Sequence, residues 1–133
     1  MNPTPKQATS KAATWAAWIL TALIMLAFVP SAVMKLTLNP MAVEGFTQMN
    51  VPQGAIVPIG VVELLCLVIF LVPRTVVLGM LLLTGYLGGA TFANIVGGTD
   101  FIHALAIGLL VWVAACLRAP ELRALIPIRK TPA

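Results

Sequence analysis

This chain is poor in the side chains on which most enzymes rely. Charged residues make up 9% of its 133 residues, only four are acidic, and there is one histidine and one tyrosine. A single histidine cannot supply both ligands of a bis-histidine haem. The chain also has no CxxC pair, phosphate-binding loop or nucleotide fingerprint, which argues against thiol–disulfide and nucleotide chemistry.

Cysteine is equally scarce. Cys66 and Cys116 fall in different apolar segments and at different expected depths. We therefore expect no disulfide between them and interpret both as small hydrophobic residues, the usual role of a buried cysteine.

Long apolar runs take the place of polar sequence. Hydrophobic residues make up 60% of the chain, and four runs stand out, at 12–34, 55–72, 75–99 and 101–117. A helix needs about 20 residues to cross a bilayer, and a soluble domain with four such runs would have almost nothing to face water. We predict an all-α fold, a transmembrane up-down-up-down four-helix bundle with spans at about 13–35, 55–72, 75–97 and 101–117.

The remaining segments fit this single transmembrane domain, 12–118. Residues 1–11 are expected to form a flexible tail and 119–133 a second tail. Between the first two spans, Asn39-Pro40 is typical of a helix cap followed by its first residue. It predicts a short amphipathic helix that lies on the outer face of the membrane and ends near Gln48.

Basic residues are distributed unevenly. Seven of the eight lie in segments that share one side of the predicted bundle: Lys6, Lys11, Arg74, Arg118, Arg123, Arg129 and Lys130. By the positive-inside rule both termini are cytoplasmic, and we expect a multi-pass protein of a bacterial inner membrane. Cleavage after Pro30-Ser31-Ala32 is not expected, because the first run is long for a signal peptide. The scattered cations also argue against nucleic-acid binding.

Glu63 is the most informative residue, because an acid within a span is costly and usually functional. It lies nine residues after Gly54, and Tyr86 lies eleven before Gly97. The helical rise places them at similar depths, roughly 13 and 16 Å. Other polar groups lie nearer the outer surface. We predict an outward-opening pocket with these candidate ligand-binding residues: Lys35, Glu63, Tyr86, His103, Asn94 and Thr91.

Structural interpretations stay open for these residues. Glu63 could be a structural pin paired with Lys35, and His103 could simply bond Asp100. Gly85, Gly88 and Gly89 are expected to allow close helix packing, or else to clear room for a flat ligand beside Tyr86. No catalytic residue or metal site is predicted.

Several segments together resemble the DoxX-like family of small four-helix membrane proteins. They are Ser31-Ala32-Val33-Met34-Lys35-Leu36, Gly60-Val61-Val62-Glu63-Leu64, Thr84-Gly85-Tyr86-Leu87-Gly88-Gly89-Ala90 and a histidine early in the last span. The family's namesake looks like a membrane subunit of a thiosulfate:quinone oxidoreductase. Other relatives are linked to membrane oxidative-stress complexes or to receptor assembly. The resemblance directs attention to Lys35, Glu63, Tyr86 and His103.

These observations predict an accessory or anchoring subunit of a membrane redox system, more a non-autonomous subunit than an enzyme by itself. Tyr86 and Glu63 would contact a quinone or other small ligand, Lys35 would keep Glu63 ionised, and His103 would exchange protons with the outer side. Expected partners are the lipid bilayer and another membrane or peripheral redox protein, and a homo-oligomer is possible on this pattern. The alternatives are a small proton-coupled transporter subunit and a non-catalytic assembly factor.

Overall fold

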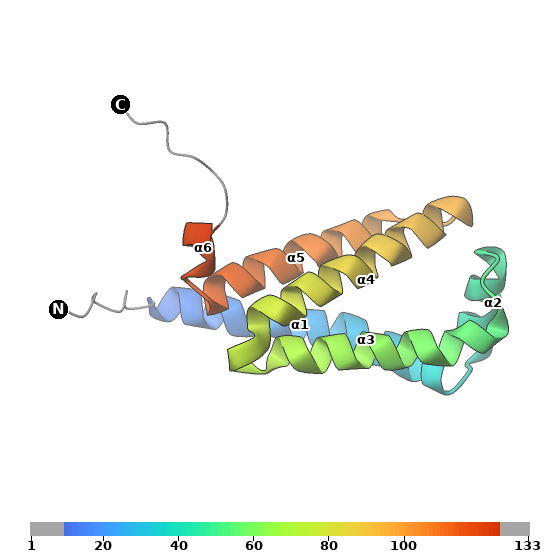
Figure 1. The fold of residues 1–133 in the computed structure, drawn as a ribbon, viewed down its shortest axis with the longest axis horizontal. Helices are drawn as coiled ribbons and strands as arrows, with labels where there is room; N and C mark the ends of the chain where they lie inside the picture. Colours follow the sequence, from blue (N-terminus) through green and yellow to red (C-terminus); the bar gives the residue numbers. More distant parts are fainter. Residues whose placement is uncertain (1–9, 126–133) are drawn as a thin grey trace, which may run out of the picture.

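The computed structural model describes residues 10–125, and within them the all-helical prediction is confirmed. Most of both predicted tails, including Lys6, Arg129 and Lys130, lies outside the described residues. Four long helices make up most of the structure (Figure 1): α1 (Lys11–Leu36), α3 (Ile56–Leu71), α4 (Val76–Val96) and α5 (Ile102–Arg118). The shorter elements are α2 (Pro40–Gln48), α6 (Leu122–Leu125) and the 3-10 turns η1 (Gln53–Ala55) and η2 (Pro73–Thr75).

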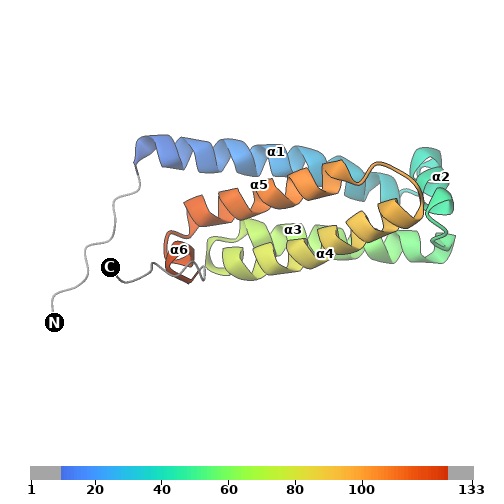
Figure 2. The same cartoon turned by 90° about the horizontal axis from the view of Figure 1, so that it is seen from above.

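The four long helices form a ring of antiparallel neighbours. α1 packs beside α3 and α5, and α4 packs beside the same two helices on the other side. The chain reverses direction between successive long helices, and α2 lies across one end of the ring (Figure 2). We call this the α2 end. The opposite end, where α1 begins and α5 finishes, is called the terminal end.

Local chemistry explains where the helices begin and end. The Ser10 side chain accepts a hydrogen bond from the backbone N–H of Ala13 at the start of α1. The Asn39 side chain does the same for Met41, with Pro40 at the first helical position, so the predicted short helix is confirmed. Such caps satisfy backbone N–H groups that have no partner within the helix.

Arg118 ties the end of α5 to the end of α3. Its guanidinium donates to the carbonyl oxygens of Phe70 and Leu71, at 2.9 and 2.8 Å. These carbonyls belong to the last turn of α3, where no helical N–H is available to them. The contact therefore places a cation at the C-terminal end of α3, where the helix dipole favours positive charge.

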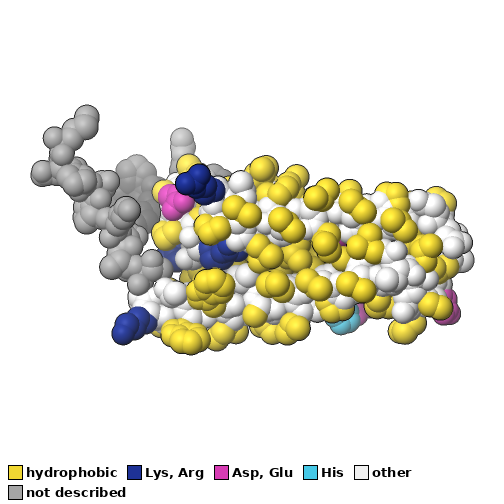
Figure 3. Space-filling view, turned by 90° about the horizontal axis from the view of Figure 1, so that it is seen from below, with side chains coloured by type: hydrophobic (Ala, Val, Ile, Leu, Met, Phe, Trp, Pro, Cys, Tyr) yellow, Lys and Arg dark blue, Asp and Glu magenta, His cyan; other side chains and the backbone are white. Residues whose placement is uncertain are grey.

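The outside of the bundle is apolar enough to face lipid. α1, α3 with η1, and α4 with η2 are each long and apolar enough to cross a membrane, and α5 is a shorter apolar helix of 17 residues. Large apolar side chains such as Trp15, Leu26 and Phe92 are exposed. On the face drawn in Figure 3, hydrophobic side chains cover most of the surface and Lys and Arg gather toward the terminal end.

The core runs along the bundle axis. Its largest fully buried apolar side chains are Phe70, Ile24, Ile56, Met80, Leu83 and Val111. Cys66 is buried and Cys116 is half-buried, and both are free thiols, as expected.

Two glycines set the spacing of the helices. A Cβ at Gly79 would overlap the backbone of Phe70, so α4 touches α3 directly near the terminal end. A Cβ at Gly60 would lie 2.9 Å from the Cβ of Lys35, so α3 touches α1 in the half near the α2 end. From the Gly79 contact, α3 and α4 diverge toward the α2 end (Figure 1). The bundle is therefore wedge-shaped on this side.

Gly79→Ala should destabilise the bundle, because the added methyl group must push α4 away from the backbone of α3. Overpacking of this kind costs about 1–3 kcal/mol, which thermal unfolding in detergent would detect as a lower midpoint. Gly88→Ala is the matched control, since a Cβ there meets no atom within 4 Å. Equal midpoints for the two variants would contradict the contact.

Candidate ligand-binding site

A buried ion pair joins α1 to α3. Lys35 lies in the last turn of α1, and its Nζ is 2.7 Å from Oε2 of Glu63 on α3. The two residues are 8% and 2% exposed. Lys35 also donates to the hydroxyl of Ser31, one turn earlier. The pairing anticipated from the sequence is thus present, and the missing side chain at Gly60 gives α3 room to approach.

The pair retains hydrogen-bonding capacity. A lysine ammonium has three donors, and Lys35 uses two of them, on Ser31 and Glu63. Oε1 of Glu63 accepts no hydrogen bond of normal geometry within the described residues. Every fully buried side-chain oxygen or nitrogen there has a partner. Oε1 must therefore reach open space inside the bundle.

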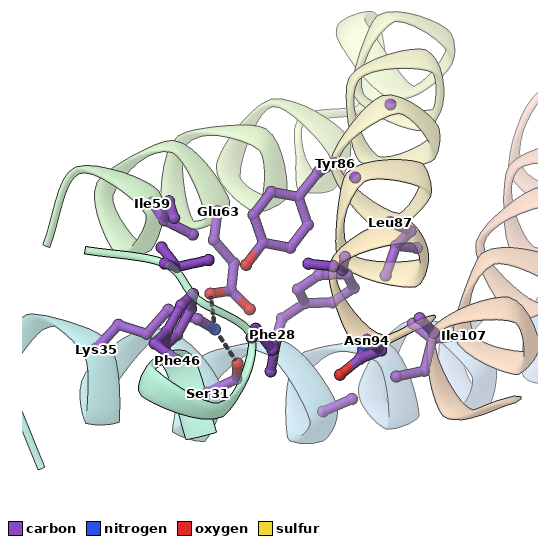
Figure 4. Close-up of a pocket in the computed structure, with 18 residues that line it drawn as sticks. Phe28, Ser31, Lys35, Phe46, Ile59, Glu63, Tyr86, Leu87, Asn94 and Ile107 are labelled. Atoms are coloured by element: carbon purple, nitrogen blue, oxygen red, sulfur yellow. Dashed lines mark hydrogen bonds and ion pairs between the residues drawn. The ribbon is translucent and has the colours of Figure 1, made fainter. Parts of the chain in front are cut away.

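That space is a cavity of about 570 Å³ near the α2 end. Its polar lining groups come from Lys35, Glu63, Ser31, Tyr86 and Asn94. Tyr86 projects from α4 and its hydroxyl points toward the carboxylate of Glu63 (Figure 4). The remaining walls are apolar or small: Ala27, Phe28, Phe46, Met49, Val51, Ile59, Gly85, Leu87, Gly89, Ala90, Ala93, Ala104 and Ile107.

The Tyr86 ring is held by an aromatic neighbour. Its centroid lies 6.1 Å from that of Phe28 on α1, with the planes tilted by 56°. This geometry falls within the range in which aromatic pairs attract one another. Ring packing therefore directs the hydroxyl toward the Glu63 carboxylate at the wall of the cavity.

α2 covers the end of this cavity that is farther from the terminal end. Phe46 and Met49 from α2 line it, and the Lys35 Nζ lies 6.0 Å from the centre of the Phe46 ring. A Cβ at Gly97 would lie 2.9 Å from the Cα of Met49, so the end of α2 rests on the end of α4. The outward opening expected from the sequence is therefore covered.

Four of the six predicted ligand-binding residues line the cavity: Lys35, Glu63, Tyr86 and Asn94. The Asn94 side chain also accepts a hydrogen bond from the Thr99 hydroxyl at 2.8 Å. Thr91 and His103 do not line it. The Thr91 hydroxyl donates to the backbone carbonyl of Leu87, one turn earlier in α4, at 2.7 Å.

His103 lies on the outside of the bundle. Its side chain is 84% exposed, and its Nδ1 is 2.7 Å from Oδ2 of Asp100. This contact is the structural alternative stated above, in which His103 simply bonds Asp100.

The close packing expected at Gly85, Gly88 and Gly89 is not found between helices of this chain. A Cβ at any of the three would meet no atom within 4 Å, and Gly85 and Gly89 line the cavity. The close contacts fall instead at Gly60 and Gly79. The small residues of α4 instead border space that no other side chain fills. This agrees better with the alternative that the glycines leave room for a ligand beside Tyr86.

Of the lining residues that sequence reasoning missed, two lie beside the Lys35 ammonium, Ser31 and Phe46. Ser31 is four residues before Lys35, a spacing that places both on one helix face, and this signal could have found it. Phe46 is an apolar residue of α2, and nothing in its local sequence marks it as a site residue. Its position over the Lys35 ammonium depends on how α2 folds back, which no local pattern reveals.

Comparison with known proteins places this geometry in a family. A model of the DoxX-like family matches residues 19–117, which include all four long helices in whole or in large part and every polar group of the cavity. The chain belongs to the DoxX-like family. This DoxX-like chain is a multi-pass membrane protein, as its apolar helices also indicate. No curated protein and no solved structure matches it.

In this DoxX-like protein, Lys35→Met should be more destabilising than the double variant Lys35→Met/Glu63→Gln. Removing one partner of a buried pair leaves an uncompensated charge, at a cost of about 3–5 kcal/mol, whereas neutral glutamine removes that charge. Thermal or denaturant unfolding in detergent of the wild type, the single variants and the double variant would measure the coupling. Additive effects would show that the pair does not act as a unit.

Proposed function

We propose that this protein is an accessory or anchoring subunit of a membrane redox system, which holds a quinone or another small ligand with a polar head in the cavity. One observation carries the proposal: a carboxylate–ammonium pair with unused hydrogen-bonding capacity faces an otherwise mostly apolar cavity. A few converging polar groups on apolar walls are typical of small-molecule sites, and about 570 Å³ is within their usual size.

The donor set suits a head with carbonyl oxygens. The third N–H of Lys35 is a donor that such oxygens need, and the Tyr86 hydroxyl, which points toward Glu63, becomes a second donor when it turns to the head. Glu63 Oε1 is an acceptor that suits a hydroxylated head. A bound quinone would supply the oxidation and reduction chemistry, while the residues of this chain bind it, orient it and exclude water. The partner would be another membrane or peripheral redox protein.

The two alternative functions have different support. A transporter subunit needs a polar route across the membrane, and large apolar side chains, among them Phe70, Met80 and Leu83, are fully buried in the half of the described bundle near the terminal end. That observation disfavours transport. An assembly role would use the exposed glycines of α4 as a docking face, and it remains the second candidate because a Cβ at Gly88 meets open space.

Glu63→Gln should weaken ligand binding about tenfold or more. Hydrogen bonds to charged groups contribute about 1.5–3 kcal/mol, and each 1.4 kcal/mol is a tenfold change. The measurement is native mass spectrometry of detergent-purified protein, with extraction of the co-purified molecule and titration of a short-chain quinone. Glu44→Gln is the control, because Glu44 is an exposed acid of α2 outside the cavity.

Tyr86→Phe in the same assay should weaken binding less, by roughly fivefold, since it removes one neutral hydrogen bond and keeps the ring. A wild type that binds no quinone and carries no other ligand would overturn the proposed function. So would equal binding by wild type and Glu63→Gln.

We also propose that the termini face the cytoplasm of a bacterial inner membrane. Four of the five described cations, Lys11, Arg74, Arg118 and Arg123, belong to segments at the terminal end, and the positive-inside rule favours a cytoplasmic position for that end. A green fluorescent protein fused to the C-terminus should fluoresce in bacterial cells, and alkaline phosphatase fused there should be inactive. Active phosphatase would reverse the orientation.

A further inference from the structure

We infer that the ligand enters the cavity sideways from the bilayer, between α3 and α4, and that it carries a hydrocarbon chain which lies in this gap when bound. The inference rests on the proposed function for the polar head. It adds the route and the chemical class: an amphiphile with a compact hydrogen-bonding head and a flexible apolar chain.

The first observation is a break in the wall of the cavity along α4. Four small residues of this helix line the cavity beside Tyr86: Gly85, Gly89, Ala90 and Ala93. Gly85 and Gly89 are at the same time exposed, and a Cβ at either would meet no atom within 4 Å. They share a helix face with Leu82, whose side chain is exposed and does not line the cavity, so this face of α4 runs from the cavity to the outside and marks its mouth.

The mouth faces lipid. α3 and α4 touch at the Phe70–Gly79 contact and diverge from there toward the α2 end (Figure 1), so the gap lies between two membrane-spanning helices. Exposed apolar side chains are found on both, Val62 on α3 and Leu82 and Phe92 on α4. A hydrated or charged solute would have to shed its water at such an opening, at several kcal/mol, whereas a hydrocarbon chain loses nothing.

Three other sides of the cavity are covered. Phe46 and Met49 of α2 lie over the end that is farther from the terminal end. The α1–α3 joint is closed where Gly60 meets Lys35, and on the side of the terminal end the cavity meets packed core side chains such as Leu67 and Leu83.

The depth of the polar groups sets the orientation of the ligand. Glu63 is 2% exposed and lies at the inner wall, with Oε1 free to accept a hydrogen bond. The head must therefore pass the mouth first and bond to the ion pair and Tyr86. The chain trails back between α3 and α4, past Gly89.

The test compares two probes that share one head. The first is a dimethoxy-methyl-benzoquinone with a ten-carbon chain, and the second is the same quinone without a chain. We expect wild type to bind the chain-bearing probe at least tenfold more tightly. Gly89→Leu should lower that affinity about tenfold or more, because the leucine occupies the path of the chain, and should weaken binding of the chain-free probe by a clearly smaller factor.

Gly88→Leu is the matched control. Gly88 is exposed on the same helix and has the same open surroundings, but it does not line the cavity, so both affinities should stay at wild-type values. Gly85→Leu, at the other exposed glycine of the mouth, is a second variant that should behave like Gly89→Leu. Unfolding midpoints of all variants show whether the bundle is intact.

The contrary outcomes are distinct. If Gly89→Leu and Gly85→Leu leave both affinities unchanged, the sideways route is wrong while the proposed function stands. Equal binding of the two probes by wild type would show that the chain is not recognised. Equal losses in Gly88→Leu and Gly89→Leu would indicate a general effect of α4. If wild type binds neither probe and carries no other ligand, the proposed function itself fails.

Discussion

The buried pair of Lys35 and Glu63 is the constraint on which the rest of the structure depends. In a chain surrounded by hydrocarbon, neither charge is tolerable without the other, so α1 and α3 must meet at this level. Gly60 makes the meeting possible, because any side chain there would push against Lys35. Ser31 and the Phe46 ring complete the surroundings of the ammonium. The position of α2 is tied to the same group.

This constraint also produces the cavity. α3 is held against α1 by the ion pair and against α4 by the Phe70–Gly79 contact, and the two contacts lie toward opposite ends of α3. α4 is therefore free to diverge in the half near α2. Large side chains on α4 could have filled the space, as happens in a normal packed core. The chain instead has several glycines and alanines there, and the Tyr86 side chain reaches toward Glu63 on α3.

The sequence predicted the helices well, because their ends depend on local quantities. Apolar length, Asn39-Pro40 and the short turns gave boundaries within a few residues of those observed. The pairing of Glu63 also followed, from the cost of an isolated charge. Thr91 and His103 show the limit. The helical rise gives the depth of a residue, but the direction of its side chain around the axis depends on how neighbouring helices pack. Both lie outside the cavity for this reason.

The glycines illustrate the same limit and lead to the functional argument. A small-xxx-small pattern indicates that another group can approach the helix closely, but it does not indicate which group that is. At Gly79 the structure shows it to be another helix, and at Gly85 and Gly89 it is open space. An opening of this kind toward lipid costs little in a membrane, since acyl chains can fill it. An occupant that arrives from the bilayer would use such an opening to reach buried polar groups whose hydrogen-bonding capacity is partly unused. The ion pair then has two roles in one geometry, to hold α1 to α3 and to present one acceptor and one donor at the inner end of an apolar entrance.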